Sequence, residues 1–261
     1  MKTTRKILAI SVSVIGLSLA SGAMAAQYAY MGDVGSEPWG MTTNKDAMDA
    51  AFGAGNWDRI NWGDSIAGYS FVYADGGDSA GTGFYNYVGS NQALLENFVT
   101  AGGSLFLNAA SNGHYGINYN LIFGATTTEG TNGGYSSNAY AVNPGDPMFA
   151  GAGSQWQGNY FAHNVLTGNA SFTTFITGDS NEAIVIGGAF GSGYALLGGQ
   201  TNTGWHTGVN GSDPFQLRVN QLQYAAGNIA PVPEPETYAM MLAGLGLLGL
   251  AARRRKLRAA A

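Results

Sequence analysis

Both ends of the chain are apolar segments with basic residues beside them, and a globular fold has to form between them. The first apolar segment is Ile7–Ala20 and the last is Ala239–Ala252. We expect one exported domain over residues 26–230, because about 205 residues bury a substantial core but seldom divide into several domains. Hydrophobic residues make up 45% of the 261 residues, which excludes a disordered chain.

The first segment has the three parts of a secretory signal peptide. Basic residues stand at its start, its apolar run is shorter than the about 20 residues that span a membrane, and Ala23 and Ala25 are the small residues of a cleavage site. We therefore expect residues 1–25 to be removed by cleavage between Ala25 and Ala26, and the rest of the chain to be exported.

The last segment combines a Pro-rich motif, an apolar run and a basic cluster. The motif is Pro233-Glu234-Pro235, and the apolar run after it is compatible with a transmembrane helix. The stop-transfer signal is the basic cluster Arg253, Arg254, Arg255 and Lys256. Because such clusters stay on the cytoplasmic side, we expect a transient inner-membrane anchor with the body outside and the C-terminus in the cytoplasm.

Residues 231–258 closely resemble the PEP-CTERM sorting signal of Gram-negative bacteria, which has the same three parts in the same order. The resemblance implies that an exosortase, a membrane protease-transpeptidase, is a partner and cuts the chain near the motif. It also implies a place in the cell envelope or in the extracellular polysaccharide of a biofilm matrix. The alternative is an ordinary C-terminal membrane anchor that is never cut.

The charges of the body exclude a nucleic-acid partner. Between residues 26 and 230 only Lys45, Arg59 and Arg218 are basic, against 14 acidic residues, so this part carries a formal charge of −11. Nucleic-acid binding depends on clustered basic residues, and the body has no such cluster. The chain also has no cysteine, which excludes disulfides, cysteine nucleophiles and thiolate metal sites.

The hydrophobic pattern of the body predicts strands that alternate with helices. Tyr69–Ala74 and Ser104–Asn108 have the composition of buried strands, and the amphipathic segment Asn91–Thr100 lies between them and ends at Gly102-Gly103. This order predicts a βαβ unit with a parallel pair of strands. The other expected elements are strands at 27–31 and 171–177, a hairpin of 183–186 with 194–197, and helices at 45–52 and 215–225.

Two stretches of the body resemble flavodoxin-like, glutamine-amidotransferase-like domains. Leu94–Asn108 resembles a helix and strand of such domains, and Asn143–Phe149 resembles the loop before their second half. The resemblance implies a single α/β domain of this type. The enzymes of that class use a cysteine at a sharp turn between a strand and a helix, so the lack of cysteine argues against that chemistry.

Ser111, His114 and His163 are the candidate catalytic residues. Ser111 follows a predicted strand, where hydrolases place a nucleophile, and His114 lies three residues further along. An extracellular hydrolase would use Ser111 or a carboxylate with either histidine. A polar turn and hydrogen-bonded loop histidines explain the same residues, and no serine lies in a G-x-S-x-G elbow. We therefore predict a non-enzymatic protein with no resident metal or cofactor.

Two further patterns indicate binding. Asp75 and Asp78, with Asn86 nearby, are candidate oxygen ligands for calcium outside the EF-hand pattern. The segments Gly133–Tyr140 and Gln155–Tyr160 are rich in Tyr, Asn, Gly and Trp, residues that suit stacking on sugars and hydrogen bonding to them. The sequence thus leaves three possibilities for the body: a matrix passenger, a hydrolase, or a module that binds carbohydrate or calcium.

Overall fold

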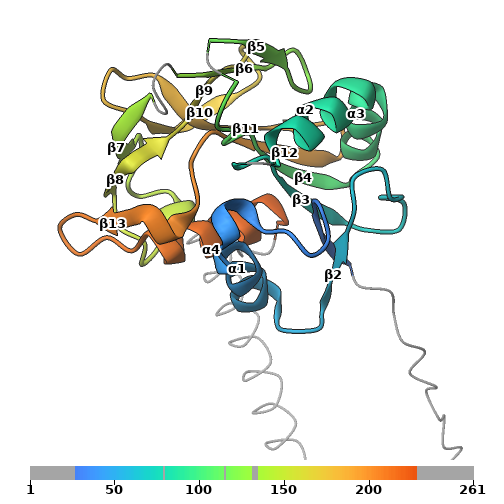
Figure 1. The fold of residues 1–261 in the computed structure, drawn as a ribbon, viewed down its shortest axis with the longest axis horizontal. Coiled ribbons are helices and arrows are strands. Elements are labelled where there is room, and N and C mark those ends of the chain that lie inside the picture. Colours follow the sequence, from blue (N-terminus) through green and yellow to red (C-terminus); the bar gives the residue numbers. More distant parts are fainter. Residues whose placement is uncertain (1–26, 79, 115, 131–134, 228–261) are drawn as a thin grey trace, which may run out of the picture.

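The computed structural model describes residues 27–78, 80–114, 116–130 and 135–227 (Figure 1). The expected signal peptide, its cleavage site at Ala25 and Ala26, and the whole C-terminal sorting signal lie outside these residues. None of the helices in the described ranges combines the length and the apolar character that a membrane crossing requires.

One half of the central sheet is parallel. Its five strands lie side by side in the order β12-β4-β3-β1-β2, and every neighbouring pair in this half is parallel. The strands are β1 (Tyr28–Met31), β2 (Trp57–Ile60), β3 (Phe71–Asp75), β4 (Ser104–Asn108) and β12 (Gly193–Gly198). Because these strands run in one direction, all their carboxyl ends meet at one edge of the sheet.

The other half of the sheet is antiparallel. It continues from β12 through β11, β10, β7 and β8 to β13, while β9, β6 and β5 branch off from β11. The strands are β5 (Asn118–Asn120), β6 (Thr126–Glu129), β7 (Ser136–Ala141), β8 (Gln155–Ala162), β9 (Asn164–Thr167), β10 (Thr173–Thr177), β11 (Ala183–Phe190) and β13 (His206–Gly208).

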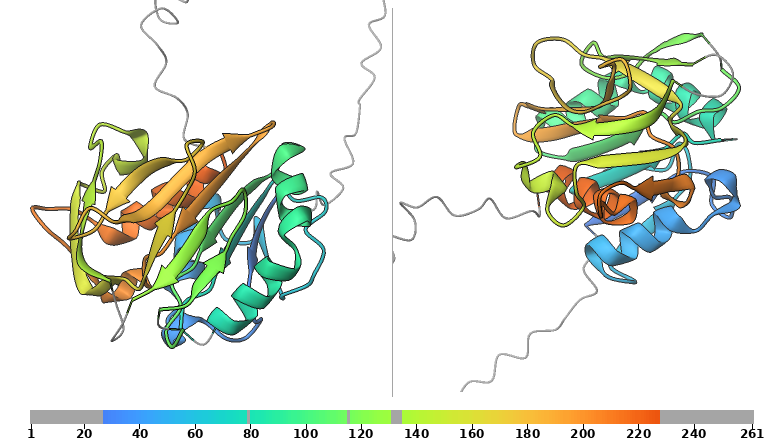
Figure 2. Two further views of the ribbon diagram at one scale, coloured as in Figure 1. Left: turned by 90° about the horizontal axis from the view of Figure 1, so that it is seen from above. Right: turned by 90° about the vertical axis from the view of Figure 1, so that its left-hand side faces the viewer.

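Helices cover both faces of the sheet, which gives three layers. Figure 2 shows α1 and α4 on one face and α2 and α3 on the other. The side chains of β3 alternate between two cores: Phe71 and Tyr73 pack towards α1 and α4, whereas Val72 and Ala74 pack towards α2 and α3. The helices are α1 (Thr43–Phe52), α2 (Gly81–Ser90), α3 (Gln92–Thr100) and α4 (Pro214–Ala225), with short 3₁₀ turns η1 (Pro38–Gly40), η3 (Pro147–Phe149) and η4 (Thr203–Trp205).

The predicted βαβ unit and hairpin are confirmed. β3 and β4 are parallel, and β11 and β12 form the antiparallel hairpin. The connection between β3 and β4 contains two helices, however, and α2 was not predicted. Gly81 and Gly83 make its start a poor helix former, yet a Cβ atom at Gly83 would lie 2.6 Å from the indole nitrogen of Trp62. Close packing against Trp62 thus explains a glycine that weakens the local helix signal.

The predicted flavodoxin-like fold is correct in its layers and incomplete in its sheet. The structure is an α/β domain, but its sheet is mixed, and several antiparallel strands lie where no strand was predicted. These strands are β5, β6, β7, β8, β9 and β13. These strands are short or contain many polar residues, as in Ser136–Ala141 (SSNAYA), so no apolar run marks them in the sequence and pairing with neighbouring strands completes them.

Candidate functional site

The loops that follow the parallel strands gather the candidate residues at one edge of the sheet. Trp39 follows β1, Asp78 follows β3 and Ser111 follows β4, while Thr201 and Trp205 follow β12. Open α/β sheets bind their ligands outside the carboxyl ends of the strands, because the loops there converge from several elements. A ligand-binding site is therefore expected at this edge of the sheet.

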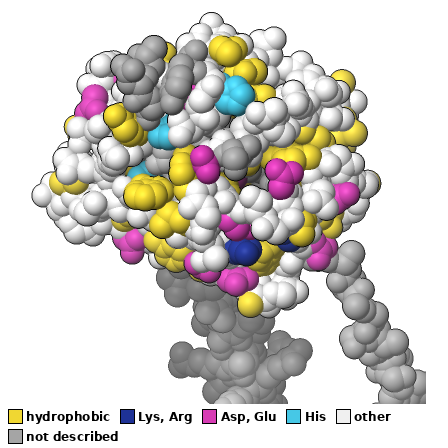
Figure 3. All heavy atoms as spheres, viewed as in Figure 1, with side chains coloured by type: hydrophobic (Ala, Val, Ile, Leu, Met, Phe, Trp, Pro, Cys, Tyr) yellow, Lys and Arg dark blue, Asp and Glu magenta, His cyan; other side chains and the backbone are white. Residues whose placement is uncertain are grey.

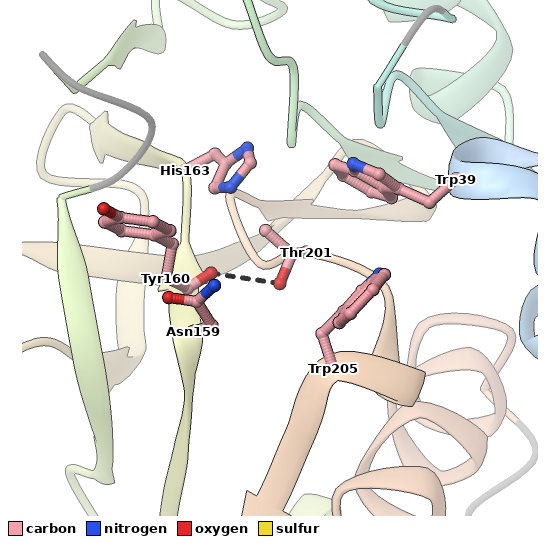
Figure 4. A pocket seen from close by; sticks show the side chains of 6 residues that line it. All are labelled: Trp39, Asn159, Tyr160, His163, Thr201 and Trp205. Carbon is pink, nitrogen blue, oxygen red and sulfur yellow. Dashed lines mark hydrogen bonds between the residues drawn. The ribbon is translucent and has the colours of Figure 1, made fainter.

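An aromatic pocket of about 170 Å³ lies at this edge. Its described lining residues are Trp39, Asn159, Tyr160, His163, Thr201 and Trp205. Figure 4 shows the rings of Trp39, Trp205 and Tyr160 around the central Thr201. Trp205 is 51% exposed and Tyr160 is 39% exposed, so both rings are accessible to a ligand.

The backbone is strained at two of these aromatic residues. Trp39 has a φ of 53° and Tyr160 has a φ of 60°, both in the left-handed region that bulky side chains avoid. The carboxylate of Asp78, which itself has a φ of 49°, accepts a hydrogen bond of 3.3 Å from the Trp39 amide. The indole lies against Gly77, where a Cβ atom would come within 2.6 Å of it. Such strain persists only where neighbours hold it, and it concentrates at functional sites.

Thr201 holds the backbone beneath the pocket. Its hydroxyl donates to the carbonyl oxygen of Tyr160 at 3.1 Å, as the dashed line in Figure 4 shows. The Nε2 atom of His206 lies 2.5 Å from the same hydroxyl oxygen. Burial, together with the nearby Arg218 and His163, lowers the pKa of His206 to about 3. This histidine is therefore a neutral support at ordinary pH.

His163 supplies a neutral polar group in the wall of the pocket. Its Nδ1 atom donates to the carbonyl oxygen of Ser111 at 3.0 Å, which leaves Nε2 unprotonated. Burial lowers the pKa of His163, and this effect outweighs the hydrogen bond to Ser111 and the carboxylates of Glu129 and Asp78. Within the described part of the chain Nε2 makes no hydrogen bond, so it can accept one from a ligand.

A polar groove of about 420 Å³ adjoins the aromatic pocket. Its described lining residues are Ser137, Asn138, Gln157, Gly158, Asn159, Trp205 and Thr207. Asn159 and Trp205 line both hollows. The side-chain amide of Asn138 donates to Asp179 at 2.7 Å. Partial burial raises the pKa of Asp179, but hydrogen bonds from Asn138 and its neighbours lower it overall. The carboxylate is therefore ionised and hydrogen-bonded to Asn138.

The two hollows carry no basic side chain among their described lining residues. Lys45 and Arg59 both contact Glu37, and Arg218 is fully buried. On the face of the molecule drawn in Figure 3, only a small part of the surface belongs to Lys and Arg side chains. The site is thus aromatic and amide-rich in a body of negative charge.

The structure brings the candidate catalytic residues to the same edge without forming a catalytic pair. Ser111 is fully buried, and its hydroxyl donates to Glu129 at 2.7 Å. The Nδ1 atom of His114 lies 3.0 Å from the hydroxyl of Tyr119, and His163 bonds to the Ser111 backbone. In the described ranges neither imidazole reaches the Ser111 hydroxyl. Glu129, which also accepts from the amides of residues 113 and 114, was missed by the sequence analysis.

The calcium candidates do not assemble, which corrects that expectation. Both Asp75 oxygens accept hydrogen bonds in the core, one from the amide of Gly77 and the other from Asn44, Tyr73 and Asn108. Asp78 holds the Trp39 amide, and Asn86 is exposed on α2. No group of three or more acidic or histidine side chains in the described part of the chain is placed to hold a metal ion.

Sequence reasoning made no prediction for three pocket residues, Trp39, Thr201 and Trp205. The only local signal for Trp39 is its position in Pro38-Trp39-Gly40, a short turn with no neighbouring pattern of function. Asn159 and Tyr160, by contrast, belong to the segment 155–160 that was predicted to suit sugar stacking.

Comparison with known proteins identifies the C-terminal segment. Residues 231–256 match the PEP-CTERM protein-sorting motif, which confirms the resemblance drawn from the sequence. The motif implies an exported, cell-surface protein that an exosortase processes. No protein of curated function matches the chain.

The body is structurally similar to class-I glutamine-amidotransferase-like domains. A structure described as part of a GMP synthase from Thermoplasma acidophilum aligns with a TM-score of 0.52 at 10% identity, over 77% of this chain and 94% of that one. A glutamine amidotransferase from Thermotoga maritima aligns with 0.45 at 15% identity, over 67% and 75%. A GH42 β-galactosidase from G. stearothermophilus aligns with 0.49 at 15% identity, over 79% and 31%, so the chain spans about a third of that enzyme. At such low sequence identity, these similarities show the fold alone.

Proposed function

We propose that the protein is a non-enzymatic component of the cell envelope or extracellular matrix, and that its body binds polysaccharide at the aromatic pocket. The observation that carries this proposal is the cluster of Trp39, Tyr160 and Trp205 around one hollow, two of them on strained backbone. Accessible aromatic rings beside a few fixed polar groups are typical of a ligand site.

Polysaccharide fits this pocket better than other extracellular ligands do. A sugar ring presents an apolar face of C–H groups, which stacks on an indole or phenol ring, and an edge of hydroxyl groups. Those hydroxyls would meet the unprotonated Nε2 of His163 and the side chain of Asn159. The match of residues 231–256 to the sorting motif supports delivery to the cell surface, where polysaccharide is abundant.

The non-enzymatic part of the proposal is supported by the state of Ser111. A serine nucleophile needs a base within hydrogen-bond reach and access to its substrate. Ser111 has the carboxylate of Glu129 within hydrogen-bond reach, but its hydroxyl is buried away from any substrate, and the same carboxylate also holds the following loop through two backbone amides. This is the arrangement of a residue that stabilises a turn.

The processing part is tested by the intact mass of the protein recovered from envelope and medium of the native host. We expect a chain that begins at Ala26 and ends near Glu234. Replacement of Pro233, Glu234 and Pro235 with alanine should abolish the C-terminal cut. An uncut C-terminus in both proteins would reject processing and leave a simple membrane anchor.

The binding part is tested with the mature protein and matrix polysaccharide prepared from the host. Trp205→Ala should reduce the bound fraction at least fivefold in a co-sedimentation assay. Phe215→Ala is the matched control, because Phe215 is 37% exposed at the start of α4 and does not line the pocket. Equal binding by the two variants would reject the pocket as the site.

A further inference from the structure

Three adjacent strands place a row of polar side chains beside the aromatic pocket. In the sheet, Asn138 of β7 lies opposite Gln157 of β8, and Gln157 lies opposite Thr207 of β13. Directly paired residues point to the same face of a sheet, and neighbouring strands lie about 4.8 Å apart. The three side chains therefore form a row about 10 Å long, which we call the amide row.

The amide row and the aromatic pocket are continuous. Asn159 lies two residues beyond Gln157 on β8, hence on the same face, and it lines both hollows together with Trp205. Gly158 allows β13 to approach at this point, since a Cβ atom there would lie 2.8 Å from the His206 ring and 3.1 Å from the Trp205 carbonyl oxygen.

The polar groups of the row are available to a ligand. Gln157 and Thr207 are exposed, and in the described ranges their side chains make no hydrogen bond. Asn138, in contrast, is fixed by Asp179, so its remaining acceptor is held in one orientation. Amide and hydroxyl groups both donate and accept, which matches the hydroxyl groups of a sugar.

The charges around this cleft argue against an acidic polymer. The described lining residues include no Lys or Arg, and Asn138 of the row donates to the carboxylate of Asp179. A uronate or sulfate group would meet this carboxylate without a counter-charge. An uncharged chain meets no such repulsion.

We propose that the aromatic pocket and the amide row form one cleft that binds at least three consecutive units of an uncharged polysaccharide. One sugar ring stacks in the pocket and the next units lie along the row, which is longer than a single ring. The inference rests on the proposed polysaccharide binding and specifies both the charge and the minimum length of the ligand.

The test compares four ligands with the mature protein. Neutral and acidic fractions of matrix polysaccharide from the host are each cut to dimers and hexamers, and their binding is measured by isothermal titration calorimetry. We expect neutral hexamers to bind at least tenfold more tightly than neutral dimers, and acidic hexamers to bind more weakly than neutral ones.

Variants separate the two parts of the cleft. Gln157→Ala should weaken neutral hexamers by about three- to tenfold, the effect of one lost hydrogen bond, and weaken dimers less, because a dimer reaches at most the near end of the row. Trp205→Ala should weaken both lengths. Asn97→Ala is the matched control, because Asn97 is an exposed amide on α3 outside the cleft. Melting temperatures show that each variant is folded.

The outcomes distinguish the two proposals. Equal affinity for dimers and hexamers, an unchanged Gln157→Ala variant or a preference for the acidic fraction would overturn the extended neutral cleft and leave binding at the pocket intact. Failure of all four ligands to bind would overturn the proposed polysaccharide binding itself, and the inference with it.

Discussion

Arg218 and Asp75 should stabilise the fold as a coupled pair, although they do not touch. Arg218 is fully buried and Asp75 is 3% exposed. The hydroxyl of Tyr73 connects them: it donates to Asp75 Oδ2 at 2.5 Å and accepts from Arg218 Nη1 at 2.8 Å. We propose to replace Arg218 with Met and Asp75 with Asn, singly and together.

The geometry sets the size of the coupling. The two hydrogen bonds limit the distance between the carboxylate oxygen and the guanidinium nitrogen to at most about 5.3 Å. At an effective dielectric constant of about 20, opposite charges at this distance attract by roughly 3 kcal/mol. Each single replacement leaves one buried charge uncompensated, which costs about 3–5 kcal/mol. The double replacement should therefore cost about 3 kcal/mol less than the sum of the two.

Urea denaturation at pH 7 of the four proteins measures this coupling. The methionine replacement preserves the apolar contact of the Arg218 side chain, whose guanidinium lies 5.2 Å from the centre of the Phe106 ring. Arg218→Met combined with Glu96→Gln is the control, because Glu96 lies on α3 at the opposite face of the sheet and should give additive effects. Additivity of the Asp75 and Arg218 replacements to within about 0.5 kcal/mol would refute the reasoning.

Three further predictions concern single residues. Because the folded-state pKa of His206 is about 3, below its ordinary value of 6.5, its contribution to stability is complete above pH 6.5 and is lost as the pH falls towards 3. On account of His206 the free energy of unfolding should thus decrease by up to about 1.4 kcal/mol per pH unit below 6.5, and His206→Gln should reduce the slope by that amount in urea titrations at several pH values, leaving the part due to His163. Gly77→Ala should displace the Trp39 indole, which a Cβ atom would approach to 2.6 Å, and reduce polysaccharide binding as much as Trp39→Ala does; unchanged binding contradicts this. Gly193→Ala should destabilise the protein severely, because its Cβ atom would lie 2.0 Å from a backbone carbonyl oxygen. Gly89→Ala in α2 should instead stabilise it by up to about 1 kcal/mol, because a Cβ atom there would meet no other atom within 4 Å. A thermal denaturation experiment in which Gly193→Ala melts at or above Gly89→Ala would refute this.

The elements that could be predicted are those whose signal is local. β3 and β4 are continuous apolar runs because helices cover both their faces, and such runs are typical of buried parallel strands. Helix α4 begins where Asp213 accepts hydrogen bonds from the amides of residues 215 and 216. The sequence Asp213-Pro214 predicts this N-terminal cap. The sorting signal is local as well, since its three parts follow one another directly.

The elements that could not be predicted depend on partners distant in the chain. Polar residues and a glycine make up half of β7 and β8 taken together, and neither strand has the sustained apolar alternation that marks an isolated strand. They are strands because their backbone groups pair with each other and with β10 and β13. The outer antiparallel strands, and with them the amide row, therefore had no local signal, whereas β10 and β11 of the same half were predicted.

The destination of the protein can be read from short contiguous segments, because a translocation or sorting apparatus recognises the chain through local order and charge. The same kind of local evidence yields the α/β layers. The candidate site is different, since Trp39, Tyr160 and Trp205 come from three distant segments with no shared pattern. They meet because β1 and β12 are parallel members of one sheet and end at the same edge, where β8 reaches them from the antiparallel half. Pairing between strands, a property of the whole chain, creates the cleft.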